Sequence, residues 1–209
     1  MKGHGCVAAA TSPVISARAS RGRTSSRQLP TRATSAAGIW PRLLNADHVR
    51  RTREVFAAAN RAGLPIVVHA SNGATYGARQ AHVFLDQLLT AAPDVPVQIA
   101  HLWGGNGFSA DALAVYGEAV ATRRPATRHL YFDVSDAALA VSTPELAKVI
   151  AERIRQIGLD RMLYGSDAAF DNHPDAQASW TAFRNGIPLS AAEFDKIAHN
   201  VAPYLREQQ

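Results

Sequence analysis

Four short apolar runs recur along the chain, and each ends on or near a polar residue. They are IVVHA, which contains His69, VQIAH, which ends at His101, LYFDVSD, which ends around Val134 to Asp136, and MLYGSD, which ends at Asp167. The ends of these runs lie 32, 33 and 33 residues apart. Buried parallel strands are typically short continuous apolar runs rather than strict alternations. The pattern therefore predicts four strands of one parallel sheet.

Segments of helical length separate the runs, and most carry recognisable start and stop signals. A Ser, Thr, Asn or Asp at the cap, Pro at the first helical position and Gly after the last turn are the expected signals. The predicted helices are Asn45–Gly63 with Asn45 or Asp47 as cap, a helix ending before Pro93, one capped by Ser109, one from Thr143 to Gly158 with Pro144 at its start, one around Ala176–Arg184, one opened by a capping box from Ser190 to Glu193, and a short one from about Asn200.

Alternating strands and helices with a 32 to 33 residue repeat predict an α/β fold, specifically part of an eight-stranded TIM-like (β/α)8 barrel. A barrel of ~250 residues has units of about 31 residues. One repeat earlier, a strand should end near residue 36, where SAAGI offers no apolar run. We therefore expect about four βα units, strands 5–8 of the barrel, in residues 41–209, with the first half of the barrel missing.

The basic charge of the chain lies almost entirely in its first part. The formal net charge is +5, but no acidic residue precedes Asp47, and seven of the 22 basic residues lie before it. The rest of the chain therefore carries a net charge of −2, which does not indicate a nucleic-acid-binding surface. Residues 1–40, rich in Ser, Thr, Ala and Arg, are predicted to be a disordered basic tail. Cys6, the only cysteine, and the lack of a membrane-length apolar run favour a cytoplasmic protein.

Three strand ends carry residues that can bind a metal or move a proton. In a barrel the carboxyl ends of the strands open on one face, where active sites lie. His69, His101 and Asp167 are predicted to meet there. Imidazole and carboxylate groups bind divalent metals such as Zn²⁺, which lower the pKa of a bound water to about 7.

Four segments resemble the second half of the amidohydrolase superfamily, in its amidohydrolase-related hydrolase and decarboxylase branch. They are HVRRTREVFAAANRAGLPIVVHAS, QIAHLWGG, LYGSDA and FDKIAHNVAPYL. The resemblance implies a (β/α)8 barrel that acts on a small molecule with a divalent metal, zinc or alternatively manganese. It implies that His69 is a metal ligand, that His101 positions or deprotonates the attacking water, and that Asp167 is both ligand and general base. Asn200 matches a structural position of the family.

One part of the family's pattern does not occur in this sequence. The resemblance implies a further His-x-His pair on strand 1, and no His-x-His occurs here. Four parallel strands cannot close a barrel and leave unpaired edges. We therefore expect a truncated enzyme, weakly active or inactive alone, which could form a homodimer through its open edges. The alternative is a non-catalytic barrel fragment or pairing module.

Two loops following the predicted strands hold further candidates. Tyr76, Arg79, Trp103 and Asn106 are substrate-loop candidates, because loops beyond strand ends commonly carry binding residues. The stretch from Gly105 to Ala110 also satisfies a G-x-G-x-x-A pattern, with Asp133 in place of the ribose-binding acid. A nucleotide-binding α/β enzyme is therefore a less favoured alternative.

Overall fold

The computed structural model describes residues 34–35, 45–68, 77–102, 109–135, 137, 141, 143–167 and 175–206. Within these residues, five strands form one sheet in sequence order, and all neighbouring strands are parallel. The four predicted strands are confirmed at the predicted places. The strands are β1 (Thr34–Ser35), β2 (Ile66–Val68), β3 (Val97–Ile99), β4 (Leu130–Asp133) and β5 (Met162–Leu163).

Strand β1 corrects the expectation that no strand ends near residue 36. Thr34 pairs with Ile66 and Ser35 pairs with Val67, so β1 follows the sheet's repeat although it lies in the stretch predicted to be a tail. Parallel pairing needs only backbone N–H and C=O groups. A two-residue strand can therefore form without the apolar run that marks the other four.

Of the six α-helices in the described part of the chain, four alternate with the strands and two follow the last strand, and four of the predicted caps are confirmed. Asn45, Ser109, Thr143 and Ser190 each accept a hydrogen bond from a backbone N–H in the first turn of the helix that follows. No helix within the described ranges is long and apolar enough to cross a membrane. The helices are α1 (Ala46–Arg61), α2 (Ala78–Val83), α3 (Ala110–Ala121), α4 (Pro144–Ile157), α5 (Ala176–Gly186) and α6 (Ala191–His199).

The helix predicted to end before Pro93 is less regular than its sequence suggested. It begins as α2, continues as a π-helical segment from Phe84 to Leu88 and ends in a 3-10 turn from Leu89 to Ala91. Through this change of winding Phe84, Leu85, Leu88 and Leu89 are all buried. The helix as a whole therefore keeps its apolar residues in the hydrophobic core.

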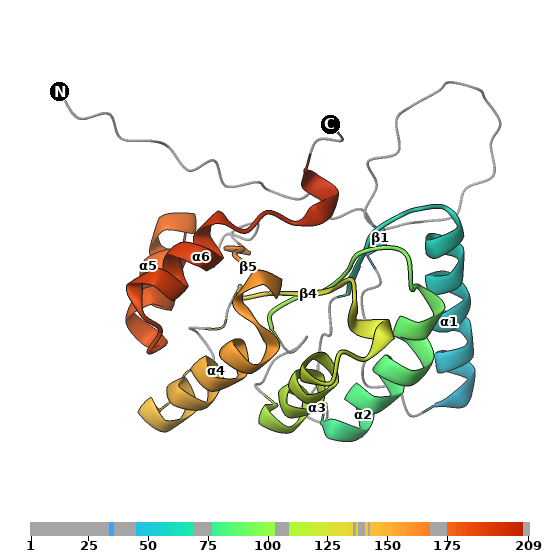
Figure 1. Cartoon of the computed structure of the whole chain (residues 1–209), viewed down its shortest axis with the longest axis horizontal. Coiled ribbons are helices and arrows are strands. Elements are labelled where there is room, and N and C mark those ends of the chain that lie inside the picture. Colours follow the sequence, from blue (N-terminus) through green and yellow to red (C-terminus); the bar gives the residue numbers. More distant parts are fainter. Residues whose placement is uncertain are drawn as a thin grey trace.

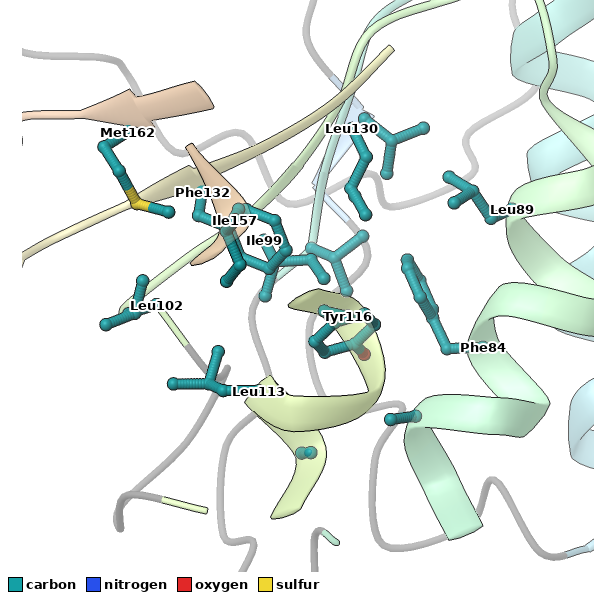
Figure 2. Packing of buried hydrophobic residues seen from close by; sticks show 14 of the residues in the cluster. Phe84, Leu89, Ile99, Leu102, Leu113, Tyr116, Leu130, Phe132, Ile157 and Met162 are labelled. Carbon is teal, nitrogen blue, oxygen red and sulfur yellow. The ribbon is translucent and has the colours of Figure 1, made fainter. Parts of the chain in front are cut away.

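The main core lies between the sheet and the helices α1 to α4. Figure 1 shows α2, α3 and α4 on one side of the sheet, with the C-terminal turn on the other. Four aromatic rings run through this core with successive edge-to-face contacts, the centroids lying 6.0, 6.1 and 5.5 Å apart. Figure 2 shows three of these rings among aliphatic side chains from the strands and helices. In order the rings are Phe56, Phe84, Tyr116 and Phe132.

The C-terminal segment covers part of the outer edge of the sheet at β5. The Asn200 side chain donates to the carbonyls of Leu159 and Met162, at 2.6 and 2.7 Å. Leu163 bonds to β4 through its carbonyl, so Met162 turns its own carbonyl to the open side. Asn200 therefore satisfies an edge carbonyl. The short helix predicted from this residue is instead a 3-10 turn from Pro203 to Leu205.

Candidate active site

The two faces of strands β3 and β4 carry different kinds of residue. On β3, Val97 and Ile99 point into the core and are fully buried, whereas Gln98 lies between them and faces the other way. On β4, Phe132 faces the core and Asp133 follows on the opposite face. Gln98 and Asp133 therefore lie on the side of the sheet away from helices α2 to α4.

Asp133 accepts hydrogen bonds from four groups although its side chain is almost fully buried. Its Oδ1 accepts from the backbone N–H of His101 at 2.8 Å, from the backbone N–H of Ser135 at 3.3 Å and from the Ser135 hydroxyl at 2.5 Å. Its Oδ2 accepts from the amide of Gln98 at 2.8 Å. These donors compensate for the cost of removing the carboxylate from water. They also occupy both oxygens, which does not favour the ribose-binding role of the nucleotide alternative.

His101 contacts this carboxylate a second time through Ser135. The Ser135 hydroxyl oxygen lies 3.0 Å from Nδ1 of the His101 ring. Ser135 is itself only 6% exposed, and Gly165, just after β5, packs beside it. The imidazole is thereby held at the carboxyl end of β4.

Tyr204 extends the polar chain from the C-terminal turn to β3. Its hydroxyl donates to the Gln98 side-chain oxygen at 2.5 Å, across 106 residues of sequence. Burial of the phenol, with a smaller contribution from the negative charge of Asp133, raises the pKa of Tyr204 to about 12. The phenol is therefore a hydrogen-bond donor throughout the physiological pH range.

Two of the predicted site residues have a left-handed backbone conformation, which residues other than glycine rarely adopt. The φ angles are 58° at His101, 64° at the following Leu102 and 50° at Asp167. A left-handed conformation costs a non-glycine residue on the order of 1–2 kcal/mol. His101 follows β3 closely, and Asp167 follows β5, so both deviations lie just past the carboxyl ends of strands.

The predicted site residues are only partly within the described structure. His101 and Asp167 both follow strands of the sheet at their carboxyl ends, as predicted. Arg79 was predicted to lie in a loop, but it lies exposed in the first turn of α2. His69, Tyr76, Trp103 and Asn106 fall outside the described residues, as does the glycine-rich part of the G-x-G-x-x-A stretch.

The site residues within the described structure are of types that bind a divalent metal, but they are too few to form a complete metal site. His101 and Asp167 provide an imidazole and a carboxylate, both of which bind such metals. Among the residues that the structure describes, no three His, Cys, Asp or Glu side chains group closely enough to hold a metal ion. His69 directly follows Val68, which accepts a backbone hydrogen bond from Ala100 at 2.9 Å.

The polar network as a whole was not predicted from the sequence. Gln98, Ser135 and Tyr204 were not among the predicted site residues, and Asp133 was considered only for the nucleotide alternative. A signal was present, because Gln98 and Asp133 are polar residues inside otherwise apolar strands. Polar groups within a strand of a buried parallel sheet require partners.

Parallel strands joined by helices, with polar residues at the carboxyl ends, define the chain as part of a TIM-like (β/α)8 barrel. The sequence profile of the family described as amidohydrolase matches residues 33–202, and the chain belongs to this family. The match begins next to β1 and ends before the C-terminal turn. It therefore covers every strand of the described sheet.

Comparison with solved structures finds proteins of similar fold at low sequence identity. An uncharacterised TIM-barrel protein from Bordetella bronchiseptica is 22% identical, with a TM-score of 0.46 over 72% of this chain and 48% of that one. An amidohydrolase from Burkholderia multivorans with bound zinc is 16% identical (TM-score 0.49, 83% and 63% covered). A putative 2-pyrone-4,6-dicarboxylic acid hydrolase from Pseudomonas putida is 15% identical (TM-score 0.49, 75% and 55% covered).

This chain spans between 48% and 63% of the length of these three proteins. No curated protein sequence gave a significant match.

Proposed function

We propose that this chain carries the second half of a metal-dependent hydrolase site. The reaction would be attack of water on a C–N or C–O bond of a small molecule, or decarboxylation in the same site. The observation that carries this proposal is the family match over residues 33–202, within which His101 and Asp167 follow β3 and β5 at their carboxyl ends. These are the positions at which barrel enzymes place their catalytic groups.

His69 and Asp167 are the proposed metal ligands, on the resemblance of IVVHA and LYGSDA to the family's motifs. Zn²⁺ accepts imidazole and carboxylate together, whereas Mn²⁺ prefers a larger share of oxygen ligands. The bound metal would lower the pKa of a water to about 7 and polarise the substrate. His69 and Asp167 supply two protein ligands, and zinc sites normally have at least three.

His101 is the proposed proton-transfer residue. Imidazole as a chemical group can accept and release a proton near neutral pH. The contacts to Asp133 and Ser135 hold its backbone and its ring, at 2.8 and 3.0 Å. A base held in one orientation spends less free energy on alignment in the transition state. Arg79, together with Tyr76, Trp103 and Asn106, remains a proposed contributor to substrate binding.

Residues 41–209 are the proposed barrel part, together with strand β1, and the residues that precede β1 are the proposed tail. Strands β1 and β5 are the outer strands of the described sheet. We propose that pairing at these edges gives a homodimer of a cytoplasmic protein, and that the isolated chain is weakly active. Sedimentation velocity tests this: a monomer at every accessible concentration contradicts the dimer.

Metal content is the experiment that tests the proposed function. The full chain is expressed with zinc in the medium, purified without chelator and analysed by plasma mass spectrometry. We expect zinc in the wild type and a loss of most of it in the double variant His69→Ala/Asp167→Ala. The matched control is His82→Ala/Asp111→Ala, which removes the same two residue types from exposed positions on α2 and α3. Equally low zinc in all three proteins would contradict the proposal.

A further inference from the structure

The hydrogen bonds around Ser135 have only one consistent direction. Its Oγ lies 2.5 Å from Asp133 Oδ1 and 3.0 Å from His101 Nδ1. A hydroxyl has one proton to donate, and a carboxylate only accepts. If the hydroxyl donated to the imidazole, two oxygen atoms would face each other at 2.5 Å with no proton between them. The Ser135 hydroxyl therefore donates to Asp133.

The direction of that bond determines where the proton of the imidazole lies. With its own proton directed to Asp133, the Ser135 oxygen can only accept from Nδ1 of His101, so Nδ1 carries a proton. A neutral imidazole has one N–H, and its other nitrogen carries the lone pair. We propose that Ser135 and Asp133 are positioning residues that hold neutral His101 as the Nδ1–H tautomer, which makes Nε2 the basic nitrogen.

The same carboxylate oxygen also fixes the main chain of His101. Asp133 Oδ1 accepts from the His101 backbone N–H at 2.8 Å, and His101 there has a φ of 58°. A charge-assisted hydrogen bond is stronger than a neutral one, so it offsets part of the cost of the left-handed backbone. One oxygen thus sets both the direction in which the side chain leaves the backbone and, through Ser135, the protonated nitrogen of its ring.

Asp133 is itself held from its other side. Its Oδ2 accepts from Gln98 Nε2 at 2.8 Å, and Gln98 Oε1 accepts from Tyr204 at 2.5 Å. The chain of donors runs from Tyr204 through Gln98 to the carboxylate, which is the acceptor at its end. Asp133 is therefore the final acceptor of this chain of hydrogen bonds, and the orientation of the other groups depends on it. Tyr204 is the member of the chain farthest from His101.

Imidazole ¹⁵N spectra of the full chain test the proposal. The protein is labelled with ¹⁵N-histidine, treated with EDTA, and recorded about two pH units above the ordinary histidine pKa of ~6.5. His101→Gln identifies the signals among the eight histidines. We expect His101 Nδ1 at the position of a protonated nitrogen and Nε2 at that of an unprotonated one. A wild-type Nε2–H tautomer, or equal populations of the two, would overturn the proposal.

Four variants separate the positioning role from a merely structural one. Ser135→Ala and Asp133→Ala should each move both ring signals toward intermediate values, because both tautomers become populated. Asp133→Asn should preserve the Nδ1–H tautomer, since its side-chain oxygen still accepts from Ser135 and its amide can donate to Gln98 after that side chain turns over. Tyr204→Phe is the control, because it removes the distant hydroxyl and should leave the His101 signals unchanged.

The proposal can still be tested if some of these variants do not fold. If Ser135→Ala and Asp133→Ala are unfolded, the wild type and Asp133→Asn still test the proposal, and an Nε2–H tautomer in either one overturns it. A pure Nδ1–H tautomer in folded Ser135→Ala also overturns it. The assignment of Nε2 as the working base rests on the proposed function, but the tautomer is measured without metal or substrate. Absent zinc binding with an intact Nδ1–H tautomer would refute the proposed function alone.

Discussion

The two faces of strands β3 and β4 show how one sheet serves two purposes. Toward the helices, Val97, Ile99, Leu130 and Phe132 are fully buried among apolar side chains. On the opposite face, Gln98 and Asp133 belong to a hydrogen-bonded chain that reaches His101 and Tyr204. Burial of the apolar face drives folding, while the polar face uses directional contacts to fix particular atoms. We expect that mutations on the two faces therefore differ in size and in kind.

The largest effect is expected on the apolar face at Phe132. Replacing this fully buried ring by alanine leaves a cavity next to Tyr116, whose ring centroid lies 5.5 Å away. We expect Phe132→Ala to lower the free energy of unfolding by about 3–5 kcal/mol, measured by denaturant titration. Tyr131→Ala, at the half-buried preceding position on the other face, should cost clearly less. Equal losses would show that the two faces do not differ in this way.

A smaller loss is expected at Asp133, and it should depend on hydrogen bonding rather than on volume. Asp133→Ala leaves the His101 N–H, the Ser135 hydroxyl and the Gln98 amide without their acceptor. We expect the free energy of unfolding to fall by about 2–3 kcal/mol. Asp133→Asn has nearly the same shape and should recover most of this loss. If the two variants are equally destabilised, the hydrogen bonds are not what stabilises this face.

An ion pair away from both faces shows how much an exposed polar contact contributes to the free energy of unfolding. Glu193 accepts from Arg155 at 2.5 Å and from the Ser190 backbone at 2.6 Å. The Arg155 contact, and next the Ser190 N–H, lower the pKa of Glu193 to about 2. A lowered pKa stabilises the fold above the unfolded value of ~4.3 and ceases to do so as the pH falls toward 2.

Glu193→Gln should therefore be less stable than the wild type at pH 7 and equally stable near pH 2. We expect a difference of about 1–2 kcal/mol at pH 7, because solvent screens the half-exposed Arg155. Urea titrations at several pH values measure it. A difference that does not change between pH 7 and pH 2 would contradict the assigned cause.

The smallest effect is expected at the far end of the polar face. Tyr204→Phe removes one hydroxyl from Gln98 and leaves the ring in place. We expect a loss of about 1 kcal/mol in the free energy of unfolding. Wild-type stability for Tyr204→Phe would show that the C-terminal turn does not depend on this bond.

The sequence was sufficient to predict the apolar face, because local patterns determine it. Continuous apolar runs marked β2 to β5, and cap residues such as Asn45 and Thr143 marked helix starts. Strand β1 was missed because its two residues, Thr34 and Ser35, do not belong to an apolar run. The π-helical segment was also unforeseen, since the apolar pattern from Phe84 to Leu89 fits a continuous α-helix equally well.

The polar face could be predicted only in part. The ends of strands pointed to His101 and Asp167, because every strand of a parallel sheet ends at the same edge. The hydrogen-bond partners of His101 depend on the register between β3 and β4, and the rest of the network depends on the return of the C-terminal turn to the sheet. Asp133 lies 32 residues from His101, and Tyr204 contacts Gln98 across 106 residues. No local pattern encodes such pairs. The left-handed backbone at His101 and Asp167 is likewise a consequence of surrounding contacts.

Zinc-dependent stabilisation tests most directly whether the strand ends form one metal site. A ligand that binds only the folded protein raises its melting temperature, so Zn²⁺ should stabilise the full chain. We predict a concentration-dependent rise in Tm for the wild type and for the surface variants His82→Ala and His199→Ala. His69→Ala and Asp167→Ala should each lose most of that rise. The same rise in Tm for all five proteins, or none in the wild type, would contradict the proposed site.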